Sequence, residues 1–207
     1  MTIATRRNLG YGRANNIAIR DSVRRHKYHL VCNPDVELGP NTLGGLYALM
    51  ESRLDVGLCS PRIVGTDGQL HHLCKRLPSP SDLAIRRFAP ASWFEAQRAH
   101  YEMRDHSYEQ PMEAPFLSGC FMFFRCQVLA RLGGFDERYF LYIEDLDLSR
   151  RAGALARNLY TPDIQIVHGA QRGAYKSLRL LRYFSTSVFR YFNKWGWFEK
   201  PWFSVPK

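Results

Sequence analysis

The fold of this chain is constrained most by four short apolar segments, which are YHLVC (28–32), VGLCSPRIV (56–64), FLSGCFMFFR (116–125) and IQIVHG (164–169). Each has the length and apolar content of a buried strand. Helix-like segments stand between or after them, around residues 14–25, 40–53, 126–132, 144–155 and 172–193. Because strands that alternate with helices are typical of layered proteins, we predict an α/β fold with a mainly parallel sheet.

Composition and charge narrow the class of protein. The chain has 207 residues, of which 45% are hydrophobic, so it suits one domain with an appendage and can bury a substantial core. Its net charge of +10 is concentrated at both ends: residues 1–29 carry seven Lys or Arg against one acid, and residues 169–207 carry eight against one. Such ends attract anions, which could be nucleotide phosphates, nucleic acid or an acidic membrane.

The cysteines and the hydropathy of the sequence indicate the cellular compartment of the protein. The five cysteines form no CxxC pair and four lie in apolar runs, which is typical of reduced, buried thiols in a cytosolic protein. The first thirty residues are too basic and polar for a signal peptide. No window approaches eighteen uninterrupted apolar residues, so we predict a cytoplasmic protein without a membrane span.

The C-terminal residues 169–207 combine Arg and Lys with Tyr, Phe and Trp. We therefore divide the chain into a domain of residues 1–168 and this basic aromatic tail. Three interpretations of the tail stay open: an amphipathic helix on an anionic membrane surface, a helix packed on the domain with a basic outer face, or a nucleic-acid-binding segment. The sequence contains no nucleic-acid recognition motif, so we expect no nucleic-acid partner.

The stretch FLYIEDLDLSRR (140–151) places three carboxylates directly behind four bulky apolar residues. We predict a helix that starts near Glu144, because a buried line follows at helical spacing, made of Leu148, Ala152 and Leu155. Glu144 and Asp145 then lie on either side of that line. Acids are favoured at a helix start by the dipole, which is a sufficient structural explanation for them.

Asp147 and Asp145 differ in their local partners. Asp147 has Arg151 four residues later, so we predict a surface ion pair between them. Asp145 has no such cation, and its i+4 neighbour is Ser149. A carboxylate at a helix start beside a sheet is well placed for a general base, so for Asp145 the catalytic and structural interpretations stay equally open.

Other polar residues follow the predicted strands. Asn33 and Asp35 come directly after residues 28–32, where α/β sheets bind ligands, and an Asp there can hold a divalent cation. On the residues alone, a plain Asx turn is the favoured explanation of N-P-D. His168 ends the last strand and could contact a metal or a diphosphate, or could be a core histidine.

Two further motifs carry weaker signals. NLGYGRANN (8–16) could cradle a phosphate on backbone N–H groups at a helix start, although a plain turn is at least as simple. HHLC (71–74) suggests zinc, but no second ligand pair follows at a suitable spacing. We instead predict that QLHHLCKRL is one arm of a hairpin around GTDG.

Taken in order, these pieces resemble glycosyltransferase family 2, whose members have the GT-A fold, and especially the bacterial rhamnosyltransferases of lipopolysaccharide and cell-wall polysaccharide assembly. The matching segments are NLGYGRANNIAI, LVCNPDVEL, SPRIVGTDGQL, SGCFMFFR, GGFDERYFLYIEDLDLSRR and IVHG. The resemblance implies a GT-A-like (Rossmann-like) sheet flanked by helices. It also implies that the first strands of the nucleotide-binding half are lacking before NLGYG, so the chain could be a fragment or an impaired copy.

The resemblance implies a role for each matching residue. Asp145 matches the catalytic base, and Glu144 is its companion. Ser118 and Gly119 lie in the stretch that lines the acceptor side. The matches to the nucleotide-sugar side are Asn8, Gly10, Asn15, Asn33, Asp35 and His168. Among these, Asp35 and His168 match the positions near the metal.

The implied reaction is inverting transfer of a sugar such as rhamnose from a nucleotide sugar such as dTDP-rhamnose. The acceptor would be a lipid-linked saccharide at the inner face of the cytoplasmic membrane, which suits the basic aromatic tail. A Mg²⁺ or Mn²⁺ ion at Asp35 would offset charge on the leaving group. Because Asn33 brings no negative charge, we expect that ion to be weakly held or dispensable. The alternative is a non-catalytic partner that keeps the acceptor half and the tail.

Overall fold

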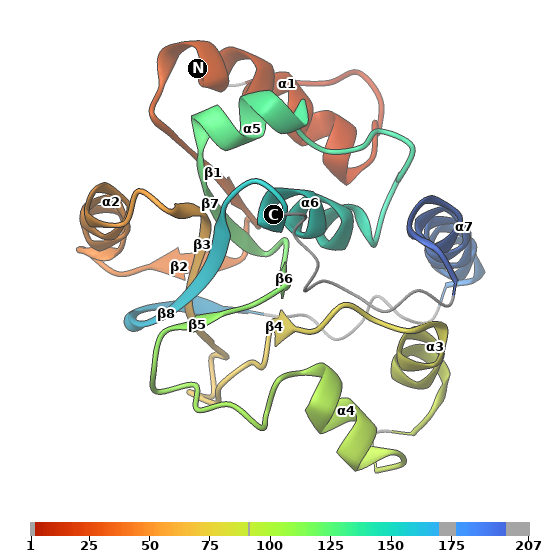
Figure 1. The fold of residues 1–207 in the computed structure, drawn as a ribbon. Helices are drawn as coiled ribbons and strands as arrows, with labels where there is room; N and C mark the ends of the chain where they lie inside the picture. The colour runs from red at the N-terminus through yellow and green to blue at the C-terminus, as the bar shows by residue number, and fades with distance from the viewer. Residues whose placement is uncertain (1–2, 91, 170–176, 198–207) are drawn as a thin grey trace.

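The computed structural model describes residues 3–90, 92–169 and 177–197, which form a sheet flanked by helices (Figure 1). The main sheet has the strand order β1-β7-β3-β8-β2, and β5 also pairs with β8. Its strands are β1 (Tyr28–Cys32), β2 (Val36–Leu38), β3 (Val56–Val64), β5 (Met112–Glu113), β7 (Phe121–Arg125) and β8 (Arg157–His168). A second sheet pairs β4 (Cys74–Lys75) with β6 (Phe116–Leu117). The predicted α/β class is confirmed.

The main sheet is mixed, so the prediction of a mainly parallel sheet was wrong in strand direction. Of its five strand pairs, only β3 with β8 is parallel. Strand β7 runs against both β1 and β3, and β2 and β5 run against β8. Strand–helix alternation could not reveal this, because β7 inserts between β1 and β3 only after a long excursion of the chain.

The described residues contain helices α1 (Tyr11–Arg25), α2 (Thr42–Ser52), α3 (Pro80–Phe88), α4 (Glu95–Tyr101), α5 (Cys126–Leu132), α6 (Glu144–Gly153) and α7 (Leu178–Trp195). In Figure 1, α1, α5 and α6 lie together and α2 lies apart from them, while α3 lies to the right of the small sheet and α4 below it. The predicted start of α6 at Glu144 is confirmed. Leu155 was wrongly predicted as buried, because α6 ends at Gly153 and Leu155 is 45% exposed.

The predicted hairpin around GTDG forms only in part. Backbone hydrogen bonds close the turn between Gly65 and Gln69, and one bridge joins Val64 to Leu70. The second arm then leaves the main sheet, because Cys74 and Lys75 pair with β6 instead. This detour places Lys75 opposite Phe116 in the small sheet.

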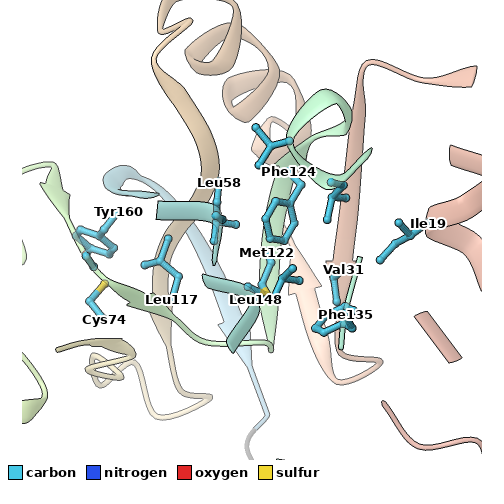
Figure 2. Packing of buried hydrophobic residues seen from close by; sticks show 14 of the residues in the cluster. Ile19, Val31, Leu58, Cys74, Leu117, Met122, Phe124, Phe135, Leu148 and Tyr160 are labelled. Carbon is cyan, nitrogen blue, oxygen red and sulfur yellow. The ribbon is translucent and has the colours of Figure 1, made fainter. Parts of the chain in front are cut away.

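The hydrophobic core fixes the position of α6 against the sheet. Figure 2 shows Val31, Met122 and Phe124 from the strands beside Phe135 and Leu148. Leu148 and Phe124 have no exposed surface. Burial of such apolar area is the dominant favourable contribution to folding, so this core holds α6 against the sheet.

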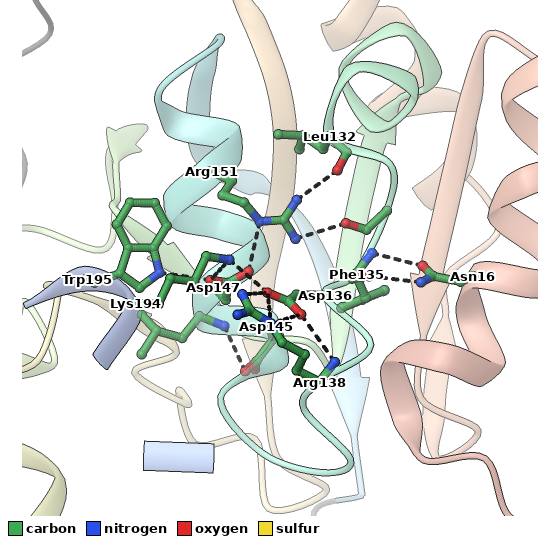
Figure 3. Close-up of polar contacts among 12 residues, drawn as sticks. Asn16, Leu132, Phe135, Asp136, Arg138, Asp145, Asp147, Arg151, Lys194 and Trp195 are labelled. Atoms are coloured by element: carbon green, nitrogen blue, oxygen red, sulfur yellow. Dashed lines mark hydrogen bonds and ion pairs between the residues drawn. The ribbon is translucent and has the colours of Figure 1, made fainter. Parts of the chain in front are cut away.

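Asp147 joins α6 to α7 and is not a surface residue, which corrects its predicted exposure. Its ion pair with Arg151 is present at 2.8 Å, but the Asp147 side chain is fully buried. Its other oxygen accepts hydrogen bonds from Lys194 Nζ at 2.7 Å and Trp195 Nε1 at 2.8 Å, as Figure 3 shows. The local pattern could not predict this, because both partners come from α7.

Within residues 3–90, 92–169 and 177–197, no helix combines the length and apolar character needed to cross a membrane.

Candidate active site

The candidate site lies where α1 and α6 start and where β1 and β8 end. A chain of contacts connects these segments. The Gly119 N–H donates to Asp145 Oδ2 at 2.8 Å, and the Gly119 carbonyl accepts from the Tyr11 hydroxyl at 2.7 Å. That hydroxyl also lies 3.3 Å from Asn33 Oδ1, and Asn33 Nδ2 lies 3.5 Å from His168 Nε2. Residues from five parts of the sequence thus meet in one place.

The backbone positions both carboxylate oxygens of Asp145. Oδ2 accepts from Gly119, and Oδ1 accepts from the Leu146 N–H at 2.9 Å in the first turn of α6. Tyr142 and Ile143, directly before this turn, have φ values of 69° and 71°. Bulky residues rarely adopt this left-handed conformation, and such strain is concentrated at functional sites. Because a carboxylate has about four lone-pair positions, Asp145 keeps the capacity to accept from a ligand.

Two glycines are required by close approach of other atoms. A Cβ on Gly119 would lie 2.9 Å from the Asp145 Cβ, and one on Gly10 would lie 2.3 Å from the Phe140 carbonyl oxygen. The Phe140 carbonyl also accepts the Tyr11 N–H at 2.9 Å, so the start of α1 docks on the loop before α6. Gly10 therefore has a structural role, and its predicted contact with the donor stays a prediction.

Asp35 and His168 form the polar pair at the other end of the site. Asp35 Oδ1 lies 3.3 Å from His168 Nε2, and the buried Nδ1 of the same ring has no hydrogen-bond partner within the described part of the chain. A carboxylate oxygen and an imidazole nitrogen are both metal ligands, so this pair fits a divalent cation. The described residues contain no cluster of three His, Cys, Asp or Glu, so a bound ion would need further ligands from substrate or water.

A cavity of about 150 Å³ opens beside Asp145. Its polar lining includes Lys75, Arg86, Glu144 and Asp145, and its aromatic lining includes Tyr101, Phe116, Tyr142 and Phe184. Glu144 is only 5% exposed, and its Oε2 has no partner among the described residues. Burial, and then the Asp145 carboxylate, raise the pKa of Glu144 to about 8. The cavity thus presents a carboxyl group that is held largely protonated at neutral pH beside Asp145.

Glu144→Gln is expected to make folding stability less dependent on pH. The folded-state pKa of Glu144, about 8, lies above its ordinary value of 4.5, so its ionisation destabilises the fold as pH rises between these values. Urea unfolding should show wild type and Glu144→Gln about equally stable near pH 4.5, and the variant more stable near pH 9 by on the order of 5 kcal/mol. The exposed Glu37→Gln serves as control. Parallel pH curves for wild type and Glu144→Gln would contradict the buried, protonated carboxyl.

The structure places some of the predicted residues in this site and others away from it. Asp145, Gly119, Asn33 and His168 belong to the contact chain, and Asp35 adjoins it. Glu144 and Ser118 line the cavity. Asn8 accepts from the Gly10 N–H at 2.9 Å and so shapes the loop before α1. Asn15 bonds back to the Tyr11 carbonyl and lines a separate hollow with Ile3 and Ala18. The roles of all these residues stay predictions.

Sequence reasoning missed Tyr11 and Lys75. Tyr11 lies between the two glycines of NLGYG, and that position in a tight loop was the available signal. Burial, followed by the Asp145 and Glu144 carboxylates, raises the pKa of Tyr11 well above its usual range, so it acts as a neutral hydrogen-bond donor. Lys75 gave no signal, because it was placed on a hairpin arm that leaves the main sheet before it reaches Lys75.

The chain is similar in sequence to known rhamnosyltransferases. It is 28% identical over 217 residues to the N-acetylglucosaminyl-diphospho-decaprenol L-rhamnosyltransferase of Mycobacterium tuberculosis. This alignment covers 96% of this chain and 69% of that protein. It is 26% identical over 198 residues to rhamnosyltransferase WbbL of Escherichia coli K12, covering 88% of this chain and 69% of WbbL. No protein-family model matches the chain.

A solved structure shares the fold. The mannosyltransferase PcManGT of Pyrobaculum calidifontis, in complex with GDP-Man and Mn²⁺, superimposes with a TM-score of 0.56 at 18% identity. The match covers 97% of this chain, which spans 47% of that structure. The chain is thus a homologue of rhamnosyltransferases with a GT-A glycosyltransferase fold, as its resemblance implied.

Proposed function

We propose that this rhamnosyltransferase homologue transfers rhamnose, or a similar sugar, from a nucleotide donor to a lipid-linked saccharide with inversion at the anomeric carbon. The observation that supports it is the position of Asp145 between two features. On one side Asp145 lines the cavity, and on the other it is connected through Gly119 and Tyr11 to Asn33 and His168. A base between two binding regions suits a reaction that joins two substrates.

Asp145 would act as the general base. It takes the proton of an acceptor hydroxyl, whose oxygen forms a bond to the anomeric carbon from the face opposite the nucleoside diphosphate. The bond from that carbon to the diphosphate oxygen breaks, and the nucleoside diphosphate leaves with the electron pair. Glu144 adds no second negative charge beside Asp145 while it stays protonated, so the acceptor oxygen meets one carboxylate.

Asp35 and His168 would hold a divalent cation at the donor side, with Asn33 beside them. Such an ion, when bound, offsets negative charge on the leaving diphosphate. The 3.3 Å separation of Asp35 Oδ1 and His168 Nε2 supports this assignment. Because the described residues offer only these two ligands, the ion would be held weakly and would depend on the donor phosphates.

Helix α7 supports peripheral attachment to an anionic membrane, which we place at the inner face of the cytoplasmic membrane. It buries Tyr191 and Phe192 against the domain, so the packing interpretation of this segment has support as well. Its exposed side chains include apolar ones, Leu178 at 84% and Phe189 at 57%, besides Arg179 and Arg182. This mixture suits a lipid surface where the acceptor resides. The tail beyond residue 197 lies outside the described residues.

Calorimetric titration with dTDP-rhamnose and with UDP- and GDP-sugars tests the proposal, once with Mn²⁺ and once with EDTA. We expect one nucleotide sugar to bind, and Asp35→Asn to weaken its binding more in Mn²⁺ than in EDTA. The exposed Asp21→Asn, on α1, is the matched control. Absence of binding to every nucleotide sugar would contradict the proposal and favour the non-catalytic alternative.

A further inference from the structure

Lys75 is an unusual residue in the wall of the cavity. It is only 3% exposed, and its ammonium makes no hydrogen bond or ion pair to any described residue. Its neighbours are aromatic, because Nζ lies 5.4 Å from the Phe116 ring centre and 6.0 Å from that of Tyr101. Burial of an ammonium without a contacting anion is costly, so such a lysine points to an anionic ligand.

Positive charge is concentrated on the same wall. Arg86 and Arg87 from α3 line the cavity with Lys75. Burial, and then the Arg86 guanidinium, lower the pKa of Lys75 to about 7, while the Asp145 and Glu102 carboxylates act in the opposite direction. Of these three cations only Lys75 is buried, and an anion that binds beside it would also lie close to the two arginines.

We propose that Lys75 binds a phosphate of the lipid-linked acceptor, while the acceptor sugar places its hydroxyl at Asp145 in the same cavity. This inference rests on the proposed function for the identity of the acceptor. A phosphate is the anionic group that such an acceptor carries next to its sugar. The aromatic rings of Tyr142 and Phe184 on the remaining wall suit the sugar face and the first lipid carbons.

The donor diphosphate is the other possible source of a phosphate. The donor-side pair, Asp35 and His168, does not line this cavity. Lys75 and Glu144 instead share the cavity with Ser118, on the side predicted for the acceptor. The experiment must therefore distinguish acceptor phosphate from donor phosphate.

Lys75→Met removes the charge and keeps the length of the side chain, so it should fold at least as stably as wild type. Lys75→Arg keeps the charge, and the exposed Lys27→Met is the control. The probes are inorganic pyrophosphate in EDTA, a short-chain GlcNAc-diphospho-lipid, octyl-GlcNAc without phosphate, and dTDP-rhamnose. Because the chain has six lysines, ¹³C-lysine NMR can follow Lys75 directly, assigned by its loss in Lys75→Met.

We expect Lys75 to titrate near neutral pH in the free protein and at higher pH with pyrophosphate or the diphospho-lipid bound. Lys75→Met should weaken binding of the diphospho-lipid by about tenfold or more, leave octyl-GlcNAc unchanged, and be partly rescued by Lys75→Arg. Equal losses for both acceptors, or a Lys75 response to dTDP-rhamnose alone, would overturn the inference. If no nucleotide sugar binds while pyrophosphate still shifts Lys75, the proposed function fails and the anion site stands.

Discussion

Asp145→Asn is expected to reduce sugar transfer by a factor of about 10³ while donor affinity stays nearly unchanged, because a general base typically contributes 10²–10⁴-fold. The structure gives two reasons. Asparagine has no lone pair basic enough to take the acceptor proton. Its amide N–H₂ would also face one of the two backbone N–H groups, of Gly119 and Leu146, that now donate to the carboxylate. Single-turnover transfer with radiolabelled donor measures the rate, and calorimetry measures donor affinity.

The matched control for this prediction is Asp55→Asn, an exposed acid paired with Arg53 and Arg157, which should transfer sugar at the wild-type rate. Loss of donor binding with an unchanged rate at saturating donor would instead make Asp145 a donor-binding or structural residue.

The fold could be predicted at the level of elements because apolar runs and their spacing are local properties. The strand at 28–32, the helix from Glu144 and the short helix to Leu132 were all identified from such patterns. Strand direction could not be predicted, because it depends on which distant strand each one meets. Residues 116–125 show the same limit: they contain β6 and β7, which pair in different sheets.

The sequence predicted the polar residues of the candidate site, but not the environment that surrounds them in the fold. Asp145, Asn33 and His168 were singled out by their positions at element ends, and the structure brings them together. Tyr11, which connects them, belongs to no catalytic motif. The environment of a charge is a tertiary property, so the sequence could not distinguish an exposed Asp147 from a buried one.

Asp147→Ala is expected to lower the free energy of unfolding by about 3–5 kcal/mol, because it leaves Arg151 and Lys194 without their shared buried anion. Lys194→Met should cost less, since Asp147 keeps Arg151 and the Trp195 Nε1–H donor. Urea unfolding measures both variants. Asp55→Ala, which removes an exposed ion-pair partner, should change stability little.

Asp147→Ala should also impair acceptor binding, because Asp147 holds α7, the helix that completes the cavity. Phe184 of α7 lines that cavity. Helix α7 contacts α6 through the hydrogen bonds of Lys194 and Trp195 to Asp147. In Lys194→Met, which keeps most of the stability, acceptor affinity should therefore fall more than donor affinity. A stability loss below about 1 kcal/mol for Asp147→Ala would show that the buried ion pair contributes no more than a surface pair. Equal losses of donor and acceptor affinity in Lys194→Met would show that α7 does not shape the acceptor side selectively.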